Sequence, residues 1–343
     1  IIMGGNSKYC HLDPIPTQLL KSCIDVLLPV LVRIVNSSLS DSCVPSSLKE
    51  ATISPLLKKP TLDPENLKNY RPVSNLPYIT KLIEKVVVCR INAHMYQNNL
   101  HEDYQSAYRQ FHSTETALLK VFSDICIAID GKKGVLLVLL DLSAAFDTVD
   151  HSVLLHRFRS TLGMSGDALD WCQSYFQNRS QRVNILGSFS NPRPLQFGMP
   201  QGSVVGPFGF SIYTTPVGQI CRKHGISYHF YADDTQLYLP FDLNEEELAL
   251  SKLEACIQEV REWMHLNYLK LNDSKTEFMV IGSPHTLKET KIASIKIGDE
   301  IINSSHSARN IGAVFDENLS MKDHIASVTK SCYYHLRNIG KIR

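Results

Sequence analysis

The stretch Tyr228-His229-Phe230-Tyr231-Ala232-Asp233-Asp234-Thr235-Gln236-Leu237-Tyr238-Leu239 places two adjacent carboxylates inside a run of aromatic and β-branched residues. The alternation of apolar and polar residues on both sides is typical of β-strands, and Pro240 is expected to end the second strand. We therefore expect a hairpin with Asp233 and Asp234 at its tip. Two neighbouring anions call for a cation. The alternative is an ordinary Asp-rich turn, because Asp is favoured in turns for its local hydrogen bonding.

A third carboxylate, Asp141, follows the most hydrophobic run of the chain, Val135–Leu140. A short, continuous apolar run predicts a strand buried on both faces, and a carboxylate at its end is costly unless its charge is compensated. If this strand lies beside the hairpin, three carboxylates converge at one end of a sheet, and their repulsion raises their pKa values unless divalent metal binds. Two Mg²⁺ ions about 3.5–4 Å apart would then support phosphoryl transfer.

The composition restricts the class of protein. With 343 residues the chain exceeds one average domain, so two or three subdomains are expected. A formal net charge of +1 gives no global attraction to nucleic acid, so any basic surface must be local. The nine cysteines contain no CxxC pair, which argues against a disulfide framework or a structural zinc site and for an intracellular protein.

Neither terminus suggests a targeting segment. The apolar residues 24–35 are too few to cross a bilayer, so no membrane association is expected. The chain starts at Ile1 without a signal-peptide pattern and ends just after a helical pattern. We therefore expect a segment of a longer reading frame.

Basic side chains outnumber acidic ones between residues 49 and 90. Residues 51–57 predict a strand that ends at Lys58-Lys59, and Pro72 favours an extended backbone at Arg71. Cations on such a hairpin could hold a triphosphate. A solvated basic face is the alternative reading of this patch.

Periodicity predicts further elements. Helices are expected at 80–95, 117–129, 153–162 and 204–220, and a last one is marked by Ile325, Val328, Cys332, Leu336 and Ile339. Asn244 and Glu247 predict a capping-box start for an acidic helix. Strands are expected at 278–281, 295–302 and 311–315. The glycine-containing turn 198–203 would let the backbone approach a ligand.

Five ordered motifs together resemble the reverse transcriptase domain of non-LTR (LINE-type) retrotransposons of the jockey, CR1, L2 and Rex group. They are Asn69-Tyr70-Arg71-Pro72, Asp141-Leu142-Ser143-Ala144-Ala145-Phe146-Asp147, Pro200-Gln201-Gly202-Ser203, Tyr231-Ala232-Asp233-Asp234, and Leu271-Asn272 with Lys275-Thr276-Glu277. The resemblance covers nearly the whole chain. It implies an α+β right-hand polymerase whose antiparallel palm sheet carries the Asp-Asp hairpin.

The resemblance also implies a domain layout. Residues 1–47 would form an N-terminal helical extension and 48–133 the fingers. Residues 134–316 would form the palm, with a fingers-side return at about 164–197, and 317–343 the start of a truncated thumb.

Site roles are likewise implied by the resemblance. Asp141 and Asp233 would be shared metal ligands, Asp234 would complete the acidic triad, and the Leu142 carbonyl would be a further ligand near the nucleotide. Lys275 would lie near the departing pyrophosphate, where it could donate a proton.

Further residues would hold the substrates. Arg71 and Lys59 would bind the incoming triphosphate, and Gln201 and Gly202 would contact the nucleotide and template. Gly312, in the strand expected at 311–315, falls where the family has its primer grip.

Phe146 lies five positions after Asp141, where the family has an aromatic ring against the sugar. Such a ring leaves no room for a ribose 2′ hydroxyl, which favours dNTP substrates over a viral RNA-dependent RNA polymerase. The alternative is a core aromatic. The sequence departs from the family at Gly209, where a glycine inside a helix costs about 1 kcal/mol and suggests decay of a genomic copy.

The expected activity is RNA-directed DNA polymerisation from dNTPs, with an RNA template, a DNA primer or target, and two Mg²⁺ ions that Mn²⁺ can replace. An endonuclease domain is expected elsewhere in the full-length element. The expected location is intracellular, as a ribonucleoprotein in cytoplasm and nucleus. A catalytically silent nucleic-acid-binding relic is the main alternative, and a host-adopted telomerase-like enzyme is a third.

Overall fold

The computed structural model describes residues 2–4 and 10–342, which form two compact units. Unit 1 comprises Ile1–His101 and Phe146–Tyr213, and unit 2 comprises Glu102–Ala145 and Thr214–Arg343. Residues 102–133, expected in the fingers, therefore lie in the same compact unit as the acidic residues. Among the described residues, no helix combines the length and apolar character needed to cross a membrane.

Unit 1 is built on a sheet in which β1 (Glu50–Leu57) is central. It pairs antiparallel with β2 (Tyr70–Asn75) and parallel with β4 (Ser180–Ile185), and the short strands β5 (Ser188–Phe189) and β6 (Arg193–Pro194) pair with β4. The predicted basic hairpin is confirmed, because Arg71 pairs with Leu56. The helices of this unit are α1 (Thr17–Ser22), α2 (Ile24–Ser40), α3 (Tyr78–Gln97), α5 (His151–Leu162) and α6 (Gly166–Phe176). Gly163, in the left-handed conformation, ends α5.

A buried carboxylate ties three parts of unit 1 together. Glu84 of α3 is fully buried and accepts hydrogen bonds from the Tyr175 hydroxyl at 2.7 Å and the Val204 N–H at 2.6 Å. Burial raises the pKa of Glu84, and these two hydrogen bonds and nearby cations oppose the shift. The Val204 contact fixes the chain just before α7 (Val205–Lys223), whose residues 205–213 belong to this unit.

Unit 2 contains an antiparallel sheet in the order β7 (Ser227–Tyr231), β8 (Asp234–Phe241), β3 (Gly134–Leu140), β9 (Glu277–Ile281). The predicted hairpin and the predicted buried strand are both confirmed. The prediction that Pro240 ends its strand is wrong, because β8 continues to Phe241. Pairing of β8 with β7 stops at Tyr238, so at Pro240 only β3 pairs with β8. Proline is tolerated in such a position, because no strand on the open side needs its missing N–H.

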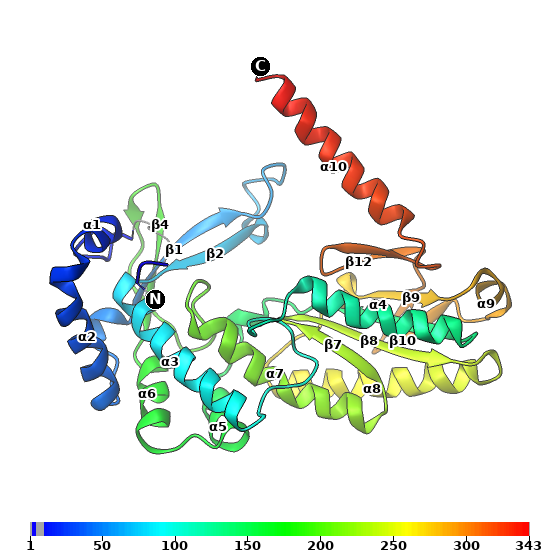
Figure 1. Ribbon diagram of the computed structural model, residues 1–343, viewed down its shortest axis with the longest axis horizontal. Helices are drawn as coiled ribbons and strands as arrows, with labels where there is room; N and C mark the ends of the chain where they lie inside the picture. The colour runs from blue at the N-terminus through cyan, green and yellow to red at the C-terminus, as the bar shows by residue number, and fades with distance from the viewer. Residues whose placement is uncertain (1, 5–9, 343) are drawn as a thin grey trace. The chain divides into compact units, whose positions relative to one another are not determined.

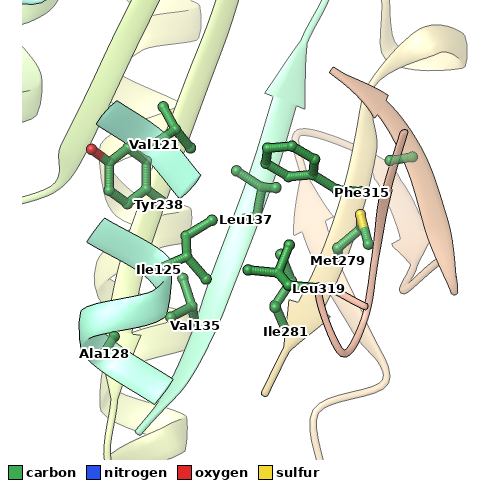
Figure 2. Packing of buried hydrophobic residues seen from close by; sticks show 11 residues of the cluster. Val121, Ile125, Ala128, Val135, Leu137, Tyr238, Met279, Ile281, Phe315 and Leu319 are labelled. Carbon is green, nitrogen blue, oxygen red and sulfur yellow. The ribbon is translucent and has the colours of Figure 1, made fainter. Parts of the chain in front are cut away.

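The hydrophobic core of unit 2 lies between this sheet and α4 (Thr114–Asp130). Figure 2 shows Val121 and Ile125 of α4 facing Leu137 of β3, with Phe315 on the other side of that residue. The other members of the cluster are Ala128, Val135, Tyr238, Met279, Ile281, Ala308 and Leu319. Because side chains alternate along a strand, the opposite face of the sheet is left to α8 (Glu246–Leu266), which contacts β8 (Figure 1). Ser113 caps α4 through a capping box with Thr116.

Two further predictions about elements in unit 2 are wrong. Asn244 does not cap α8, because residues 243–245 form a separate 3₁₀ turn and α8 begins at Glu246 without a side-chain cap. The range 295–302 is a hairpin of two strands, β10 (Ser294–Ile297) and β11 (Glu300–Asn303), because Gly298, with φ +61°, lies in a turn between them. Alternation alone did not reveal this two-residue turn.

The C-terminal part of unit 2 contains α9 (Pro284–Glu289), the hairpin of β12 (Ser307–Asn310) and β13 (Ala313–Asp316), and α10 (Lys322–Gly340). The predicted last helix is confirmed as α10, which contacts β13 at its start and extends away from the sheet (Figure 1). The hairpin is linked to the main sheet by Asn310, whose amide donates to the Gln236 side chain of β8 at 2.7 Å.

Candidate active site

Strand register brings the acidic residues to one end of the sheet in unit 2. Tyr231 pairs with Asp234 across the tip of the β7–β8 hairpin, and Ala232 at the turn has a left-handed φ of +59°. Leu140, the last residue of β3, pairs with Thr235. Asp141 therefore follows β3 on the side where Asp234 begins β8, and Asp233 lies next to both.

The carboxylates are close enough to affect one another. The pKa of Asp234 is raised from its ordinary value to about 6, first by burial and then by the negative charges of Asp233 and Asp141, while Lys275 opposes the shift. Asp234 is exposed overall, so burial removes only part of its side chain from water. The site therefore carries an excess of negative charge, which Lys275 offsets in part.

Asp141 is held by the segment after α8. One of its carboxylate oxygens accepts from the Asn272 amide at 3.1 Å and from the Lys275 ammonium at 3.0 Å. The Asn272 N–H also donates to the Asp141 carbonyl, and Leu142 pairs with Leu271. Lys275 and Leu142 thus lie beside Asp141. Asn272 is a contact that sequence reasoning missed, although it belongs to a quoted motif.

Three carboxylates match the oxygen ligands that Mg²⁺ and Mn²⁺ prefer. Across residues 2–4 and 10–342, no three His, Cys, Asp or Glu side chains stand at the spacing of a preformed metal cage. Asp141 is instead paired with the Lys275 ammonium at 3.0 Å, so one potential ligand already faces a cation. The donor set and the raised pKa of Asp234 nevertheless fit a divalent cation, whose charge would relieve the repulsion.

The predicted triphosphate ligands lie in unit 1. Arg71 is on β2 and Lys59 is in the connection from β1 to β2, and both side chains are exposed. They therefore place exposed positive charge on one hairpin, as the sequence predicted. Their role in holding a nucleotide stays a prediction.

The Gln201–Gly202 turn is built against β2 within unit 1. The Ser74 N–H donates to the Gln201 carbonyl at 2.8 Å, and the Gln201 amide donates to Asp147 at 3.0 Å. Gly202 has φ +130°, and a Cβ there would lie 2.5 Å from the Ser74 carbonyl oxygen, so only glycine fits. A cavity of about 340 Å³ beside the turn is lined by Ile53, Pro72, Ser74, Asp147, Gln181, Pro194, Leu195, Gln196, Phe197, Gly198, Met199, Pro200 and Gln201.

Phe146 lies in a 3₁₀ turn of unit 1 and is partly buried. Its ring centroid is 4.7 Å from that of Phe210 in α7, so one side of the ring packs on the core. The steric-gate role stays a prediction. Gly209 sits within an unbroken α7, and a Cβ there would come within 2.8 Å of the Met199 methyl group, so glycine makes room for that side chain.

The position predicted for Gly312 is wrong in one respect. It lies in the turn between β12 and β13, exposed and with φ +96°, and not inside a strand. The turn belongs to the unit that holds the acidic residues, and the primer-grip role stays a prediction.

The sequence of this chain is similar to those of known proteins. A sequence profile described as "Reverse transcriptase (RNA-dependent DNA polymerase)" matches residues 57–315. The chain is 28% identical over 287 residues to the "Probable RNA-directed DNA polymerase from transposon BS" of Drosophila melanogaster, a match that covers 80% of this chain and 30% of the relative. It is 26% identical over 273 residues to the "RNA-directed DNA polymerase from mobile element jockey" of Drosophila funebris, covering 78% and 29%. The chain spans under a third of the length of these relatives.

Among solved structures, the chain resembles apo telomerase from Candida tropicalis truncated from its C-terminal domain. The TM-score is 0.54 at 12% identity, and the match covers 81% of this chain and 55% of the other. At this identity the likeness concerns the fold alone. The predicted α+β right-hand polymerase fold with an antiparallel sheet is thereby confirmed.

Proposed function

The chain belongs to the reverse transcriptase (RNA-dependent DNA polymerase) family, and we propose that it extends a DNA primer with deoxynucleotides on an RNA template. The resemblance to non-LTR retrotransposons is confirmed by relatives from transposon BS, jockey and R1. The observation that supports the activity best is the meeting of Asp141, Asp233 and Asp234 at one end of the unit 2 sheet.

The family uses divalent metal ions, and we assign two Mg²⁺, replaceable by Mn²⁺, to the three carboxylates. Bound there, the ions would activate the primer 3′ hydroxyl and stabilise charge on the leaving oxygen. The negative charge of the site supports this assignment, because it needs cations to be neutralised. To ligate metal with both oxygens free, Asp141 would release Lys275, whose ammonium would then be available to the departing pyrophosphate.

The remaining roles rest on unit 1. Arg71 and Lys59 would attract the triphosphate, and Gln201 with Gly202 would present backbone and amide groups to the nucleotide and template. The partly exposed ring of Phe146 would exclude a ribose 2′ hydroxyl and so select dNTPs.

The surroundings of the reaction are also proposals. All nine cysteines are free thiols, which supports an intracellular location, where the chain would act in a ribonucleoprotein of cytoplasm and nucleus. Target cleavage would come from an endonuclease domain elsewhere in the full-length element.

Primer extension on an RNA template tests the activity. The chain should incorporate dNTPs only with Mg²⁺ or Mn²⁺, and Asp233→Asn should reduce the rate at least about 1,000-fold, because one ligand shared by both metals is lost. An unchanged rate in Asp233→Asn would refute the assigned site. Tight template–primer binding without incorporation by the wild type under any metal would instead support the silent relic.

A further inference from the structure

A segment that the proposed mechanism does not use runs along the catalytic hairpin. Residues Glu102–Tyr108, here called the strap, lie beside the edge strand β7 within unit 2. The Phe230 N–H donates to the Tyr104 carbonyl at 2.7 Å, and the Ser106 N–H donates to the Phe230 carbonyl at 3.1 Å. These two bonds extend the sheet by a short parallel pairing and fix the register of the strap against β7.

Polar side chains anchor the strap at two points. The Glu102 carboxylate accepts from the Tyr228 hydroxyl at 2.6 Å and forms an ion pair with Arg222 at 2.7 Å. The Ser106 hydroxyl lies 2.8 Å from the His229 imidazole, and both residues are buried. The strap is therefore tied to β7 before it reaches the hairpin tip.

Gln105 connects the strap to the acidic turn itself. Its side-chain oxygen accepts from the Ala107 N–H at 2.9 Å and from the Ala232 N–H at 3.2 Å, and the residue is 6% exposed. Both partners are donors, so the amide oxygen must face them, whichever way the amide group is drawn. Ala232 precedes Asp233 and has a left-handed φ, a conformation that a non-glycine residue keeps only when neighbouring contacts enforce it.

We propose that Gln105 is a positioning residue that holds the Ala232 turn and thereby sets where Asp233 presents its carboxylate. This inference rests on the proposed function, since it concerns the same acidic site. Without the acceptor, two N–H groups in a poorly solvated place lose their partner, and the turn can relax toward ordinary φ values. Asp233 would then move relative to Asp141 while β7 and β8 stay paired.

The test compares two substitutions in the strap. Gln105→Met keeps the length and approximate volume of the side chain but removes the acceptor. Ser106→Ala is the matched control, because it removes a buried hydrogen bond to His229 of β7 and none to the turn. Both variants and the wild type are assayed for thermal unfolding, Mn²⁺ binding by electron paramagnetic resonance, template–primer affinity, and kcat and KM for dNTP.

We expect Gln105→Met to lower kcat by about 10- to 100-fold, the size expected for a displacement of about 1 Å at a reacting centre. Its Mn²⁺ affinity should fall, while template–primer affinity and the KM for dNTP stay near the wild-type values. Ser106→Ala should lose similar thermal stability but keep kcat and Mn²⁺ affinity. Gln105→Glu, which restores an acceptor oxygen, should exceed Gln105→Met in kcat.

Suppose that the wild type extends primers and that Gln105→Met and Ser106→Ala have equal kcat and equal Mn²⁺ affinity. The inference about Gln105 is then wrong, and the proposed function still stands. A wild type that incorporates nothing would count against the proposed function, and Mn²⁺ binding would then still decide the inference. A fall in Mn²⁺ affinity in Gln105→Met that Ser106→Ala does not show supports it, and unchanged Mn²⁺ affinity in Gln105→Met refutes it.

Discussion

At the scale of single residues, the acidic site contains more charge than its protein surroundings balance. Asp233 and Asp141 raise the pKa of Asp234, and Lys275 is the cation that opposes the shift while it is also bonded to Asp141. The three carboxylates do not stabilise the fold, because like charges held close together destabilise the folded chain. Cations bound at this site would neutralise the repulsion among the carboxylates.

This charge predicts a pH dependence of stability. The folded pKa of Asp234, about 6, lies above its unfolded value of about 3.9, so the folded state binds more protons between those values. In the metal-free protein, the contribution of Asp234 to stability should therefore be most favourable below about pH 4 and decline as pH rises through about 6. Asp234→Asn removes this decline.

Urea unfolding in the presence of a chelator measures the effect. Near neutral pH, Asp234→Asn should be more stable than the wild type by about 1 kcal/mol or less, because solvent screens the exposed part of the carboxylate. The difference should vanish near pH 4, and adding Mg²⁺ should stabilise the wild type more than the variant. A variant that is less stable than the wild type at neutral pH would contradict the repulsion inferred for this site.

At the scale of elements, the site depends on how turns are held by distant segments. Gln105 of the strap accepts a hydrogen bond from the Ala232 N–H, and Asn272 donates one to Asp141. The Ser74 N–H of β2 donates to the Gln201 carbonyl. Strand register places each turn, and hydrogen bonds from outside the strand then fix its conformation.

Gly202→Ala tests this dependence on outside contacts at the Gln201–Gly202 turn. The added Cβ would lie 2.5 Å from the Ser74 carbonyl oxygen in a backbone conformation that alanine rarely adopts, so the turn must shift. We expect a loss of stability of about 1–3 kcal/mol and a raised KM for dNTP, with Mn²⁺ affinity unchanged, since the acidic residues belong to the other unit. Chemical denaturation and steady-state primer extension would measure both, and Gly187→Ala, at φ +90° in an exposed turn with open space around it, is the control for backbone strain. A KM that changes equally in both variants would show that the Ser74 contact has no role in nucleotide binding.

At the scale of the whole chain, the sequence predicts most elements because their signals are local. The apolar run 135–140, the hairpin around Asp233 and the helix marked by Ile325 and Ile339 are all present. The misplaced boundaries at Pro240, Asn244 and 295–302 arise where a neighbour outside the element, or a two-residue turn, decides the outcome.

The site is predictable to a similar degree. The acidic residues could be found because they stand at strand ends in recognisable motifs. The contacts of Gln105, Asn272 and Asp147 could not, since each joins segments far apart in the sequence and no periodicity encodes them. Asn272 and Asp147 lie inside quoted motifs, which is a sequence signal that could have drawn attention to them. Gln105 lies outside the five motifs.

The most direct test of the central claim is anomalous diffraction from crystals of the chain with template–primer, a nonhydrolysable dNTP and Mn²⁺. Peaks bounded by the carboxylates of Asp141 and Asp233, with Asp234 alongside, are the predicted result, and these peaks should disappear in Asp233→Asn crystals. Manganese bound elsewhere, with Asp141 still paired to Lys275 and remote from the metal, would contradict the claim that these carboxylates form the polymerase site.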